Sequence, residues 1–542
     1  MTNQQCLWRM TTILVLCFFS AVSSANVCVK LPDMETDSFQ FEDDILIESA
    51  DGTNLAVNLF SPKAVRPDAG YPAIIFINSW VLEEHEYFLQ ASFFAKKGYL
   101  VLSYSARGWG CSEGLVDVTG DNDMADLSAV IDWLSANTSV DVQNIGVSGI
   151  SYGSGISLMG LAKEPRLKTA IAMSTWASLT DSLYQQETPR LFWGFLLVSS
   201  GFLTANLDPM IAQNFFDLIF HKNIDRVTEW AEARSTKNFV HLINERNAPV
   251  YLANNLGDNL FQPNNLLKFY EQLTVPKRLD FNQGTHAISE GFGLFGLESY
   301  TWENAHRWFD YWLKGENTGI MGEPPVTMKV AMSDERTEFS SWPTNKGQEV
   351  TFYLGPRGLF SQGKLLSEPY SSWFAKSNHI YSGLDTLATS GIPLISETLE
   401  STVQLPVKTP IGLVSRVNGI VFKTEPVSRE TRIRGIGKVK LNVKASYGKF
   451  QLIAYLYDVA PDGTGTLITH GPITKYSAPK NERLELEWEL VAAAYNVAKG
   501  HKIALAIDTF DALYAVPTLV PYQLSFEFGG QVESTLKLPT VD

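Results

Sequence analysis

The chain has 542 residues, more than one ordinary domain holds, so we expect two or three domains. Hydrophobic residues make up 45% of the chain and aromatic residues 12%, which suits a large buried core and excludes a disordered protein. The formal charge of −15 argues against nucleic acid or an anionic membrane surface as a partner, because phosphate binding needs a basic face.

Residues 1–25 have the pattern of a secretory signal peptide. Arg9 precedes an apolar run over residues 13–19, and small residues over 21–25 suit cleavage after Ala25. The run is shorter than the ~20 apolar residues that span a bilayer, so a removable signal is favoured over an uncleaved anchor. We therefore expect a secreted or periplasmic protein with no stable membrane association after cleavage.

Two cysteines would remain in the mature chain, Cys28 and Cys111. In an exported protein such a pair can form one disulfide. Because Cys28 lies close to a chain terminus, the bridged and the free state both stay open.

Strands and helices alternate from the mature N-terminus to residue 175. Continuous apolar runs predict strands buried on both faces, and apolar residues three and four apart predict helices. The expected elements are a hairpin over 45–59 with Asp51-Gly52 at its turn, strands at 73–77 and 99–102, and helices at 88–97 and 121–134. This alternation predicts a mostly parallel sheet with helices on both sides.

A Gly-x-Ser-x-Gly motif over residues 149–153 follows a short apolar strand and opens a helix. This context is typical of a nucleophile elbow, in which the serine lies on a strained strand-to-helix turn above the sheet. Gly149 and Gly153 are required because the backbone crosses itself closely there and a Cβ would collide. Chance produces such motifs in a chain with 39 glycines, but the flanking elements favour Ser151 as a nucleophile.

The alternation stops over residues 176–248, which are rich in aromatic residues and helix formers. This segment is predicted to form a helical cap over the active site, although ordinary core helices are the alternative. Strand patterns resume at 250–253 and 278–281, followed by an amphipathic helix over 302–312. Residues 26–175 and 249–316 are therefore predicted to form one α/β-hydrolase catalytic domain.

A serine nucleophile needs a histidine base that is oriented by a carboxylate, and α/β-hydrolases carry these in the order Ser, acid, His. Asp258 directly follows the strand at 250–253, and His286 follows the strand at 278–281. Order and topology both favour a triad of Ser151, Asp258 and His286. An aspartate in a turn after a strand is also common for purely local reasons.

The oxyanion of an acyl-transfer reaction needs two hydrogen-bond donors. The backbone N–H of Tyr152, at the start of the elbow helix, is predicted to be one of them. The second is expected from the loop after the strand at 73–77, in which Trp80 lies.

Residues 317–542 change in character and are predicted to form an all-β sandwich or jelly roll. Long loops are expected over 355–410, which are rich in Ser, Gly and Pro. The sequence contains no phosphate-binding Gly-rich loop and no His/Cys cluster with metal-ligand spacing, so no metal site is expected. The predicted strands lie at 326–331, 350–354, 439–443, 451–457, 484–490 and 502–507.

Four stretches carry a resemblance to a known family: Ser-Ala-Arg-Gly-Trp-Gly-Cys-Ser-Glu-Gly at 105–114, the elbow at 149–153, Arg-Trp-Phe-Asp-Tyr-Trp-Leu-Lys-Gly at 307–315 and Tyr-Asp-Val-Ala-Pro-Asp-Gly at 457–463. With them the chain resembles the X-Pro dipeptidyl-peptidase/cocaine-esterase family of serine hydrolases. The resemblance implies an α/β-hydrolase core with a helical cap, and a C-terminal jelly roll that helps to wall the active site. It also implies hydrolysis of an ester or amide without a cofactor, with Ser151, Asp258 and His286 as the triad.

The chain departs from the family in two ways. Trp80 stands about where many members carry a tyrosine whose hydroxyl helps to hold the oxyanion, so an indole or backbone N–H would have to replace it. The longer X-Pro dipeptidyl-peptidases carry an extra N-terminal helical domain, for which the chain has no room. We therefore expect a carboxylic-ester or other acyl hydrolase acting on a small ester, amide or short peptide, with an X-Pro dipeptidyl-peptidase and a catalytically inert binding protein as alternatives.

Overall fold

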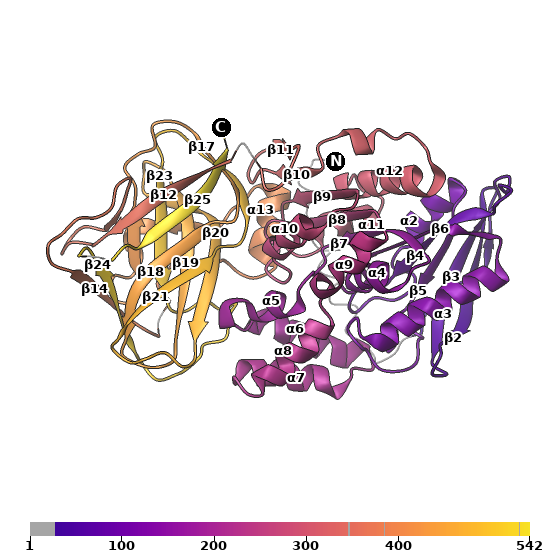
Figure 1. Ribbon diagram of the computed structural model, residues 1–542, viewed down its shortest axis with the longest axis horizontal. Coiled ribbons are helices and arrows are strands. Elements are labelled where there is room, and N and C mark those ends of the chain that lie inside the picture. The colour runs from indigo at the N-terminus through magenta and orange to yellow at the C-terminus, as the bar shows by residue number, and fades with distance from the viewer. Residues whose placement is uncertain (1–27, 345–346, 384, 531, 542) are drawn as a thin grey trace, which may run out of the picture.

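The computed structural model describes residues 28–541 except 345–346, 384 and 531, and consists of an α/β core, a helical cap and a β domain (Figure 1). The signal peptide predicted over residues 1–25 lies outside the described residues. No helix in the described part of the chain is long and apolar enough to cross a bilayer. The predicted fold class, an α/β-hydrolase core followed by a β domain, is confirmed.

The core is an eleven-stranded sheet in the order β1-β2-β3-β5-β4-β6-β7-β8-β9-β10-β11. The neighbours from β5 to β10 run parallel, and the outer pairs at both edges are antiparallel. Its strands are β1 (Met34–Glu35), β2 (Phe39–Glu48), β3 (Asn54–Pro62), β4 (Tyr71–Ile77), β5 (Leu100–Tyr104), β6 (Val140–Ile150), β7 (Leu167–Met173), β8 (Val250–Asn255), β9 (Lys277–Asn282), β10 (Val326–Lys329) and β11 (Arg336–Phe339). The carboxyl ends of the parallel strands meet at one edge, where α/β folds place their sites.

Helices cover both faces of this sheet, which explains why its central strands are continuously apolar. On one face Phe76 of β4 packs with Phe94 and Trp302 of the covering helices. On the other face Ile75 belongs to the same buried cluster as Leu127 and Leu266 of the covering helices. The first face is covered by α2 (Phe88–Lys96), α11 (Ile288–Leu294) and α12 (Tyr300–Lys314), and the second by α3 (Asp121–Asn137), α4 (Tyr152–Lys163) and α10 (Pro263–Gln272).

The strand predicted at 326–331 was assigned to the β domain, but the structure places it in the core sheet. Val326–Lys329 forms β10, which pairs parallel with β9, and β11 extends the same sheet. Val326 and Met328 are fully buried there. A short apolar strand after a helix has the same pattern whether it completes the preceding sheet or begins a new domain, so the pattern alone could not place it.

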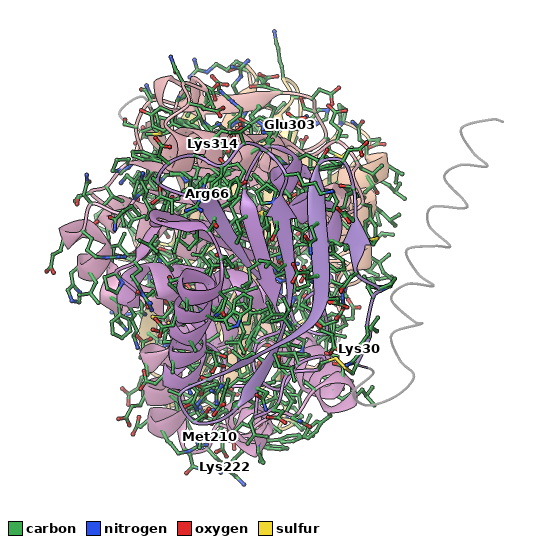
Figure 2. The ribbon with its side chains drawn as sticks, turned by 90° about the vertical axis from the view of Figure 1, so that its right-hand side faces the viewer. Lys30, Arg66, Met210, Lys222, Glu303 and Lys314 are labelled. Carbon is green, nitrogen blue, oxygen red and sulfur yellow. A yellow bond between two sulfur atoms is a disulfide. The ribbon has the colours of Figure 1, made fainter. Side chains whose placement is uncertain are left out.

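Helices fill the segment between β7 and β8 and form the cap below the core sheet in Figure 1. Met210 and Lys222 mark its tip, at the opposite end of the molecule from Glu303 and Lys314 of α12 (Figure 2). Asp208 caps α7 by accepting a hydrogen bond from the Met210 N–H at 2.8 Å. The elements of this segment are α5 (Leu179–Tyr184), η1 (Gln185–Glu187), α6 (Leu191–Thr204), α7 (Pro209–Ile219), α8 (Ile224–Ala233), η2 (Thr236–Phe239) and α9 (Val240–Glu245).

The β domain packs around its own apolar core, and all its recorded strand pairs are antiparallel except that of β13 with β16. The short η3 (Ile320–Gly322) precedes β10, and η4 (Ile411–Leu413) lies in the β domain. The strands are β12 (Gly347–Gly355), β13 (Gly363–Leu366), β14 (Lys376–Tyr381), β15 (Lys408–Pro410), β16 (Ile420–Lys423), β17 (Thr431–Gly435), β18 (Lys438–Ala445), β19 (Phe450–Val459), β20 (Thr464–Lys475), β21 (Arg483–Glu489), β22 (Ala493–Val497), β23 (Lys502–Asp508), β24 (Gln523–Phe528) and β25 (Thr535–Val541).

The segment predicted as long loops, 355–410, holds three short strands and the helix α13 (Ile395–Val403). This helix leaves the β domain and packs on the core. Glu397 of α13 accepts a hydrogen bond from Asn259, and Ser401 lies so close to Gly284 that a Cβ there would come within 3.2 Å of the serine Cβ. The β domain therefore reaches the two loops that follow β8 and β9.

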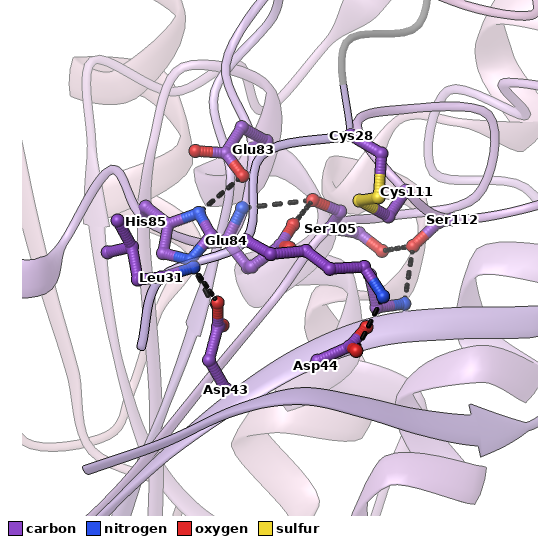
Figure 3. Close-up of a disulfide and its surroundings, with 12 residues drawn as sticks. Cys28, Leu31, Asp43, Asp44, Glu83, Glu84, His85, Ser105, Cys111 and Ser112 are labelled. Atoms are coloured by element: carbon purple, nitrogen blue, oxygen red, sulfur yellow. Dashed lines mark hydrogen bonds and ion pairs between the residues drawn. A yellow bond between two sulfur atoms is a disulfide. The ribbon is translucent and has the colours of Figure 1, made fainter. Parts of the chain in front are cut away.

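Cys28 and Cys111 form a disulfide, which resolves the choice left open by the sequence (Figure 3). The bridge joins the start of the described chain to the loop that follows β5, across 83 residues of sequence. Such a crosslink restricts the unfolded chain and therefore stabilises the fold.

Candidate active site

Ser151 lies between β6 and α4 on the turn that the motif predicted. Its backbone angles are φ 54° and ψ −115°, a strained conformation for a residue with a side chain. A Cβ on Gly153 would lie 1.9 Å from the Ile77 carbonyl oxygen, and one on Gly149 would lie 2.5 Å from the Gly153 carbonyl carbon. Only glycine allows the backbone to pass here, so both motif glycines are explained.

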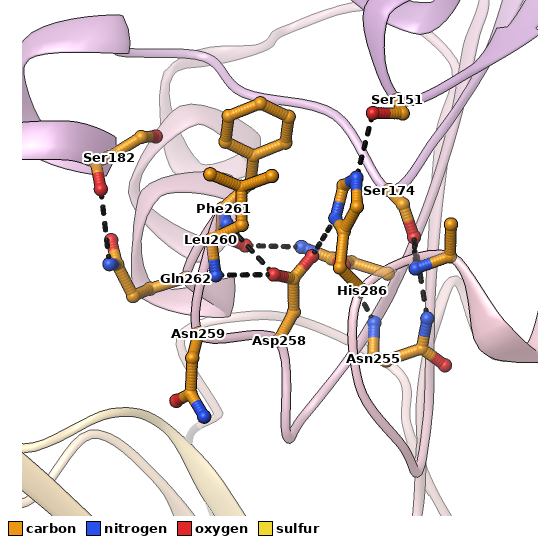
Figure 4. Close-up of polar contacts among 12 residues, drawn as sticks. Ser151, Ser174, Ser182, Asn255, Asp258, Asn259, Leu260, Phe261, Gln262 and His286 are labelled. Carbon is orange, nitrogen blue, oxygen red and sulfur yellow. Dashed lines mark hydrogen bonds and ion pairs between the residues drawn. The ribbon is translucent and has the colours of Figure 1, made fainter. Parts of the chain in front are cut away.

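The structure brings the three predicted triad residues together (Figure 4). The Ser151 Oγ lies 2.7 Å from Nε2 of His286, and Nδ1 of the same imidazole lies 2.7 Å from Oδ2 of Asp258. Ser151 and the His286 side chain are 8% and 9% exposed, whereas Asp258 is fully buried. A proton can therefore pass from the serine to an imidazole whose orientation the carboxylate determines.

The loop after β8 holds Asp258 rigidly. Its Oδ1 accepts the backbone N–H groups of Leu260 and Phe261, both at 2.8 Å, which leaves Oδ2 for the imidazole. The ring of Phe261 also lies edge-on to His286, with centroids 5.0 Å apart. Because all the carboxylate oxygens have fixed partners, the imidazole has one preferred orientation.

The oxyanion loop, residues 78–86, follows β4 and approaches Ser151. The Tyr152 N–H is the first of α4 and therefore has no acceptor within its helix. The indole N–H of Trp80 donates instead to the Leu197 carbonyl at 3.1 Å and the Ser200 hydroxyl at 3.2 Å, both on α6. Trp80 can therefore offer the oxyanion only its backbone N–H, and its side chain ties the oxyanion loop to the cap.

The carboxyl group of a half-buried glutamate supports this loop. The Ser79 N–H and Oγ both lie 2.6 Å from the carboxyl oxygens of Glu86, and the Ser79 hydroxyl also contacts the Ile150 carbonyl at 3.0 Å. Burial raises the pKa of Glu86 to about 7, although the hydrogen bonds from Ser79 act in the opposite direction. Sequence reasoning did not find Glu86, since its neighbours are also acidic and it has no distinguishing pattern.

The phenol of Tyr152 is also engaged away from the site. Its hydroxyl lies 3.2 Å from Oδ2 of Asp123 and accepts the Val118 N–H at 3.2 Å. Burial and the charges of Asp117 and Asp126 raise the pKa of Asp123 to about 8. Tyr152 can therefore contribute its amide to the oxyanion hole, while its side chain fixes the elbow helix.

A cavity of about 110 Å³ opens beside Ser151 and runs beneath the cap. Its walls are mostly apolar, and among the described residues they include no Asp or Glu, with Arg190 as the one charged residue. Arg190 is itself tied down, donating to the carbonyls of Ser182 and Asn259. The lining residues are Trp80, Val118, Ser151, Tyr152, Trp176, Leu179, Thr180, Leu183, Tyr184, Pro189, Arg190, Gly194, Leu197, Val198, Ile211, Asn214, Phe215, Leu218, Val227, Thr228, Trp230, Ala231 and Phe261.

Two further buried carboxyl groups stand behind the triad loops, and the sequence carried no signal for either. Glu397 of α13 accepts from the Asn259 amide at 2.5 Å, and burial raises its pKa to about 8. Glu290 of α11 accepts from the Asn255 amide at 2.9 Å, and burial raises its pKa as well. These groups support the loops that carry Asp258 and His286.

The arrangement suits acyl transfer. Ser151 can attack a carbonyl carbon while its proton moves to Nε2 of His286, and the two backbone N–H groups can stabilise the resulting oxyanion. The nucleophile lies 2.7 Å from the base, and the base lies 2.7 Å from the orienting carboxylate. These distances meet the geometric requirement for this chemistry.

Comparison with known proteins gives a consistent result. Residues 51–288 match the family model of X-Pro dipeptidyl-peptidase (S15 family), and residues 318–534 match that of the X-Pro dipeptidyl-peptidase C-terminal non-catalytic domain. Cocaine esterase from Rhodococcus sp. (strain MB1 Bresler) is 22% identical over 88% of this chain and 92% of its own length. The protein named "Putative Xaa-Pro dipeptidyl-peptidase" from Bacillus cereus is 21% identical over 78% of this chain and 73% of its own.

The solved structures agree on the fold. A CocE/NonD family hydrolase from Staphylococcus aureus superimposes with a TM-score of 0.73 at 15% identity, over 96% of this chain and 98% of that protein. Both family models and the assembled triad support the same family assignment, and the structural match over 96% of the chain supports the same fold. The chain therefore belongs to the X-Pro dipeptidyl-peptidase S15 / CocE/NonD hydrolase family and is a serine hydrolase of the dipeptidyl-peptidase or esterase type.

Proposed function

We propose that the protein is a secreted esterase that hydrolyses carboxylic esters with apolar acyl groups through an acyl-enzyme on Ser151. The apolar cavity beside Ser151, whose lining contains no carboxylate in the described part of the chain, is the observation that carries this proposal. An acyl chain gains free energy by leaving water for such a cavity, about 0.8 kcal/mol for each buried CH₂ group.

The reaction follows from the geometry. Ser151 Oγ attacks the ester carbonyl as His286 Nε2 takes its proton, and the oxyanion forms against the N–H groups of Tyr152 and Trp80. The intermediate collapses when His286 returns the proton to the departing alcohol, which leaves the acyl group on Ser151. Water then attacks this ester with His286 again as base, and Ser151 regains its proton as the carboxylic acid leaves.

A dipeptidyl-peptidase, the alternative within the family, has to hold the free amino end of its substrate. Three acidic residues of the cap come into question for this role, and each has another partner. Asp181 pairs with Lys237 at 3.4 Å, Glu187 pairs with Lys475, and Asp208 caps α7. This supports an acyl ester over a dipeptide as the substrate.

Export is the second part of the proposal. The signal-like segment over residues 1–25 predicts it, and the Cys28–Cys111 disulfide supports it, because disulfides persist in oxidising compartments. The mature protein should begin at Asn26 and accumulate outside the cytoplasm. Amino-terminal sequencing of the protein from its native host tests this, and a chain that retains residues 1–25 in the cytoplasm would contradict it.

The substrate class is tested with two matched series on one preparation, with Ser151→Ala as the blank. We expect kcat/KM to rise from p-nitrophenyl acetate to the butyrate and hexanoate, as the acyl chain fills the cavity. We also expect Ala-Pro-p-nitroanilide to be a poor substrate that is not made worse by acetylation of its amino group. A strong preference for the free dipeptide, lost on acetylation, would make the protein an X-Pro dipeptidyl-peptidase.

A pair of variants on one helix locates the acyl chain. Val198 of α6 lines the cavity, whereas Phe195 on the same helix is 66% exposed. Val198→Trp should lower kcat/KM for the hexanoate at least ~10-fold and leave the acetate little changed, because the indole fills the space of the longer chain. Phe195→Trp is the matched control and should change neither value. Equal effects on both esters in Val198→Trp would place the acyl group elsewhere.

A further inference from the structure

A compact group of three carboxyl side chains and one imidazole lies at the start of the core sheet, beside the Cys28–Cys111 disulfide (Figure 3). Asp43 comes from β2, and Glu83, Glu84 and His85 come from the oxyanion loop that follows β4. One ligand atom each of Asp43, Glu84 and His85 lies within 4.8 Å of the other two. The group serves no function in the triad described above.

The imidazole of His85 is held as a metal-binding histidine is held. Its Nδ1 lies 2.6 Å from Oε2 of Glu83, and its Nε2 faces Oδ1 of Asp43 at 3.0 Å. In metal sites the histidine nitrogen opposite the metal commonly donates its N–H to a carboxylate, which fixes the ring and its tautomer. Glu83 occupies that position here and leaves Nε2 directed at Asp43 and Glu84.

The carboxyl groups have too few cationic partners. The side chain of Asp43 is 2% exposed and Glu84 is 3% exposed. Glu84 Oε2 accepts the Ser105 hydroxyl, and no lysine or arginine in the described part of the chain forms an ion pair with this carboxyl group. An imidazolium has two N–H groups, and Glu83 and Asp43 take both. Glu84 is therefore a deeply buried carboxyl group that no hydrogen-bonded cation neutralises in the described part of the chain.

We propose that Asp43, Glu84 and His85 bind one divalent transition-metal ion of the zinc type. One imidazole nitrogen and two carboxylates form a ligand set that suits zinc, whereas calcium and magnesium prefer oxygen ligands alone. Two ligands of a tetrahedral zinc ion lie about 3.3 Å apart, close to the 3.0 Å between His85 Nε2 and Asp43 Oδ1. Water completes the coordination, and the Nε2 proton is released to solvent.

Such an ion would clamp the oxyanion loop to the N-terminal strands. Glu84 and His85 directly precede Glu86, which holds Ser79, while Asp43 belongs to β2 and also accepts the Leu31 N–H at 2.5 Å. The site therefore joins the oxyanion loop to β2 and, through the Leu31 N–H, to the start of the described chain. Because Asp43 lies 41 residues before Glu84, the set has none of the short spacings by which metal sites are found in a sequence.

The test is zinc binding to the tag-free mature protein, freed of metal with a chelator, by isothermal titration calorimetry and thermal unfolding. We expect one zinc ion per chain, and a melting temperature about 5 °C higher at free zinc 100-fold above Kd. His85→Ala and Asp43→Asn should abolish this binding. Glu83→Gln, which keeps all three ligands, should weaken affinity about 10- to 100-fold. Calcium at the same concentration should produce no shift.

Two control variants distinguish the proposed site from zinc binding elsewhere on the protein. Asp44→Asn removes the neighbouring carboxylate, which pairs with Lys30 at 2.5 Å outside the group, and His379→Ala removes an exposed histidine of the β domain. Both should bind zinc as the unchanged protein does. Far-UV circular dichroism verifies that each variant is folded. Three results would each overturn the proposal. They are undiminished zinc binding in folded His85→Ala, no stoichiometric binding in the unchanged protein, and binding that is lost only in His286→Ala.

Discussion

Replacement of Asp258 by asparagine tests the triad through the proton arrangement that the structure imposes. Oδ1 of Asp258 accepts two backbone N–H groups, so the single oxygen of an asparagine has to stay on that side. Its amide NH₂ then faces Nδ1 of His286, 2.7 Å away in the unchanged protein. Nδ1 has to become the acceptor, and the proton moves to Nε2, where it faces Ser151 and prevents the imidazole from acting as base.

The expected loss in kcat is about 10⁴-fold, equivalent to about 5.5 kcal/mol of transition-state stabilisation. KM for a p-nitrophenyl ester should change little, because Asp258 is fully buried and lies behind His286 rather than in the cavity lining. Steady-state hydrolysis of p-nitrophenyl butyrate at pH 7.5 measures both constants, with Ser151→Ala as the background.

Asn259→Asp is a useful comparison because it changes the next residue in the same loop, whose amide contacts Glu397 rather than His286. It should affect stability more than kcat. A loss in Asp258→Asn below 10-fold, in protein with an unchanged circular dichroism spectrum, would show that another group orients His286 and would refute the assigned proton arrangement.

Three further predictions concern the surroundings of the triad. Trp80→Phe should reduce kcat less than about 10-fold, because the indole N–H is bound to α6 and not to the oxyanion. Loss of an oxyanion donor would reduce kcat by about 10²- to 10³-fold. A 100-fold loss at constant KM would therefore contradict this prediction. Burial raises the pKa of Glu397 from 4.5 to about 8, so the stability that this group contributes is complete below pH 4.5 and is lost as the pH rises through 8. The melting temperature of Glu397→Gln relative to the unchanged protein should therefore increase from pH 5 to pH 8.5, and a pH-independent difference would disprove the shift. Both amide atoms of the buried Asn214 side chain lack a partner among the described residues, so Asn214→Leu should raise the melting temperature by about 2 to 4 °C, and a decrease would indicate a partner.

The core of the site was predictable because its determinants are local. The Gly-x-Ser-x-Gly motif of the elbow reflects two backbone collisions that only glycine avoids, at Gly149 and Gly153. Asp258 and His286 could be assigned because each directly follows a strand of a parallel sheet, and such strands end at one edge. These positions depend on chain order and strand direction, which the apolar periodicity of the sequence reveals.

The features that sequence reasoning missed depend on contacts between distant segments. Trp80 was a candidate donor by position, but the direction of its indole depends on the Leu197 carbonyl, 117 residues away. Glu397 approaches the acid loop on α13, a nine-residue helix within a segment whose composition predicted loops. β10 was assigned to the wrong sheet because its pairing with β9 leaves no trace in its own residues.

Covalent labelling of Ser151 tests the catalytic assignment most directly. The protein is treated with an alkyl fluorophosphonate, which transfers its phosphonyl group to an activated serine hydroxyl as fluoride leaves. Intact mass spectrometry should show one adduct per chain, peptide mapping should place it on Ser151, and activity should disappear in proportion to labelling. Ser151→Ala should remain unlabelled. An adduct on another residue, or full esterase activity in the labelled protein, would contradict the assignment of Ser151 as the nucleophile.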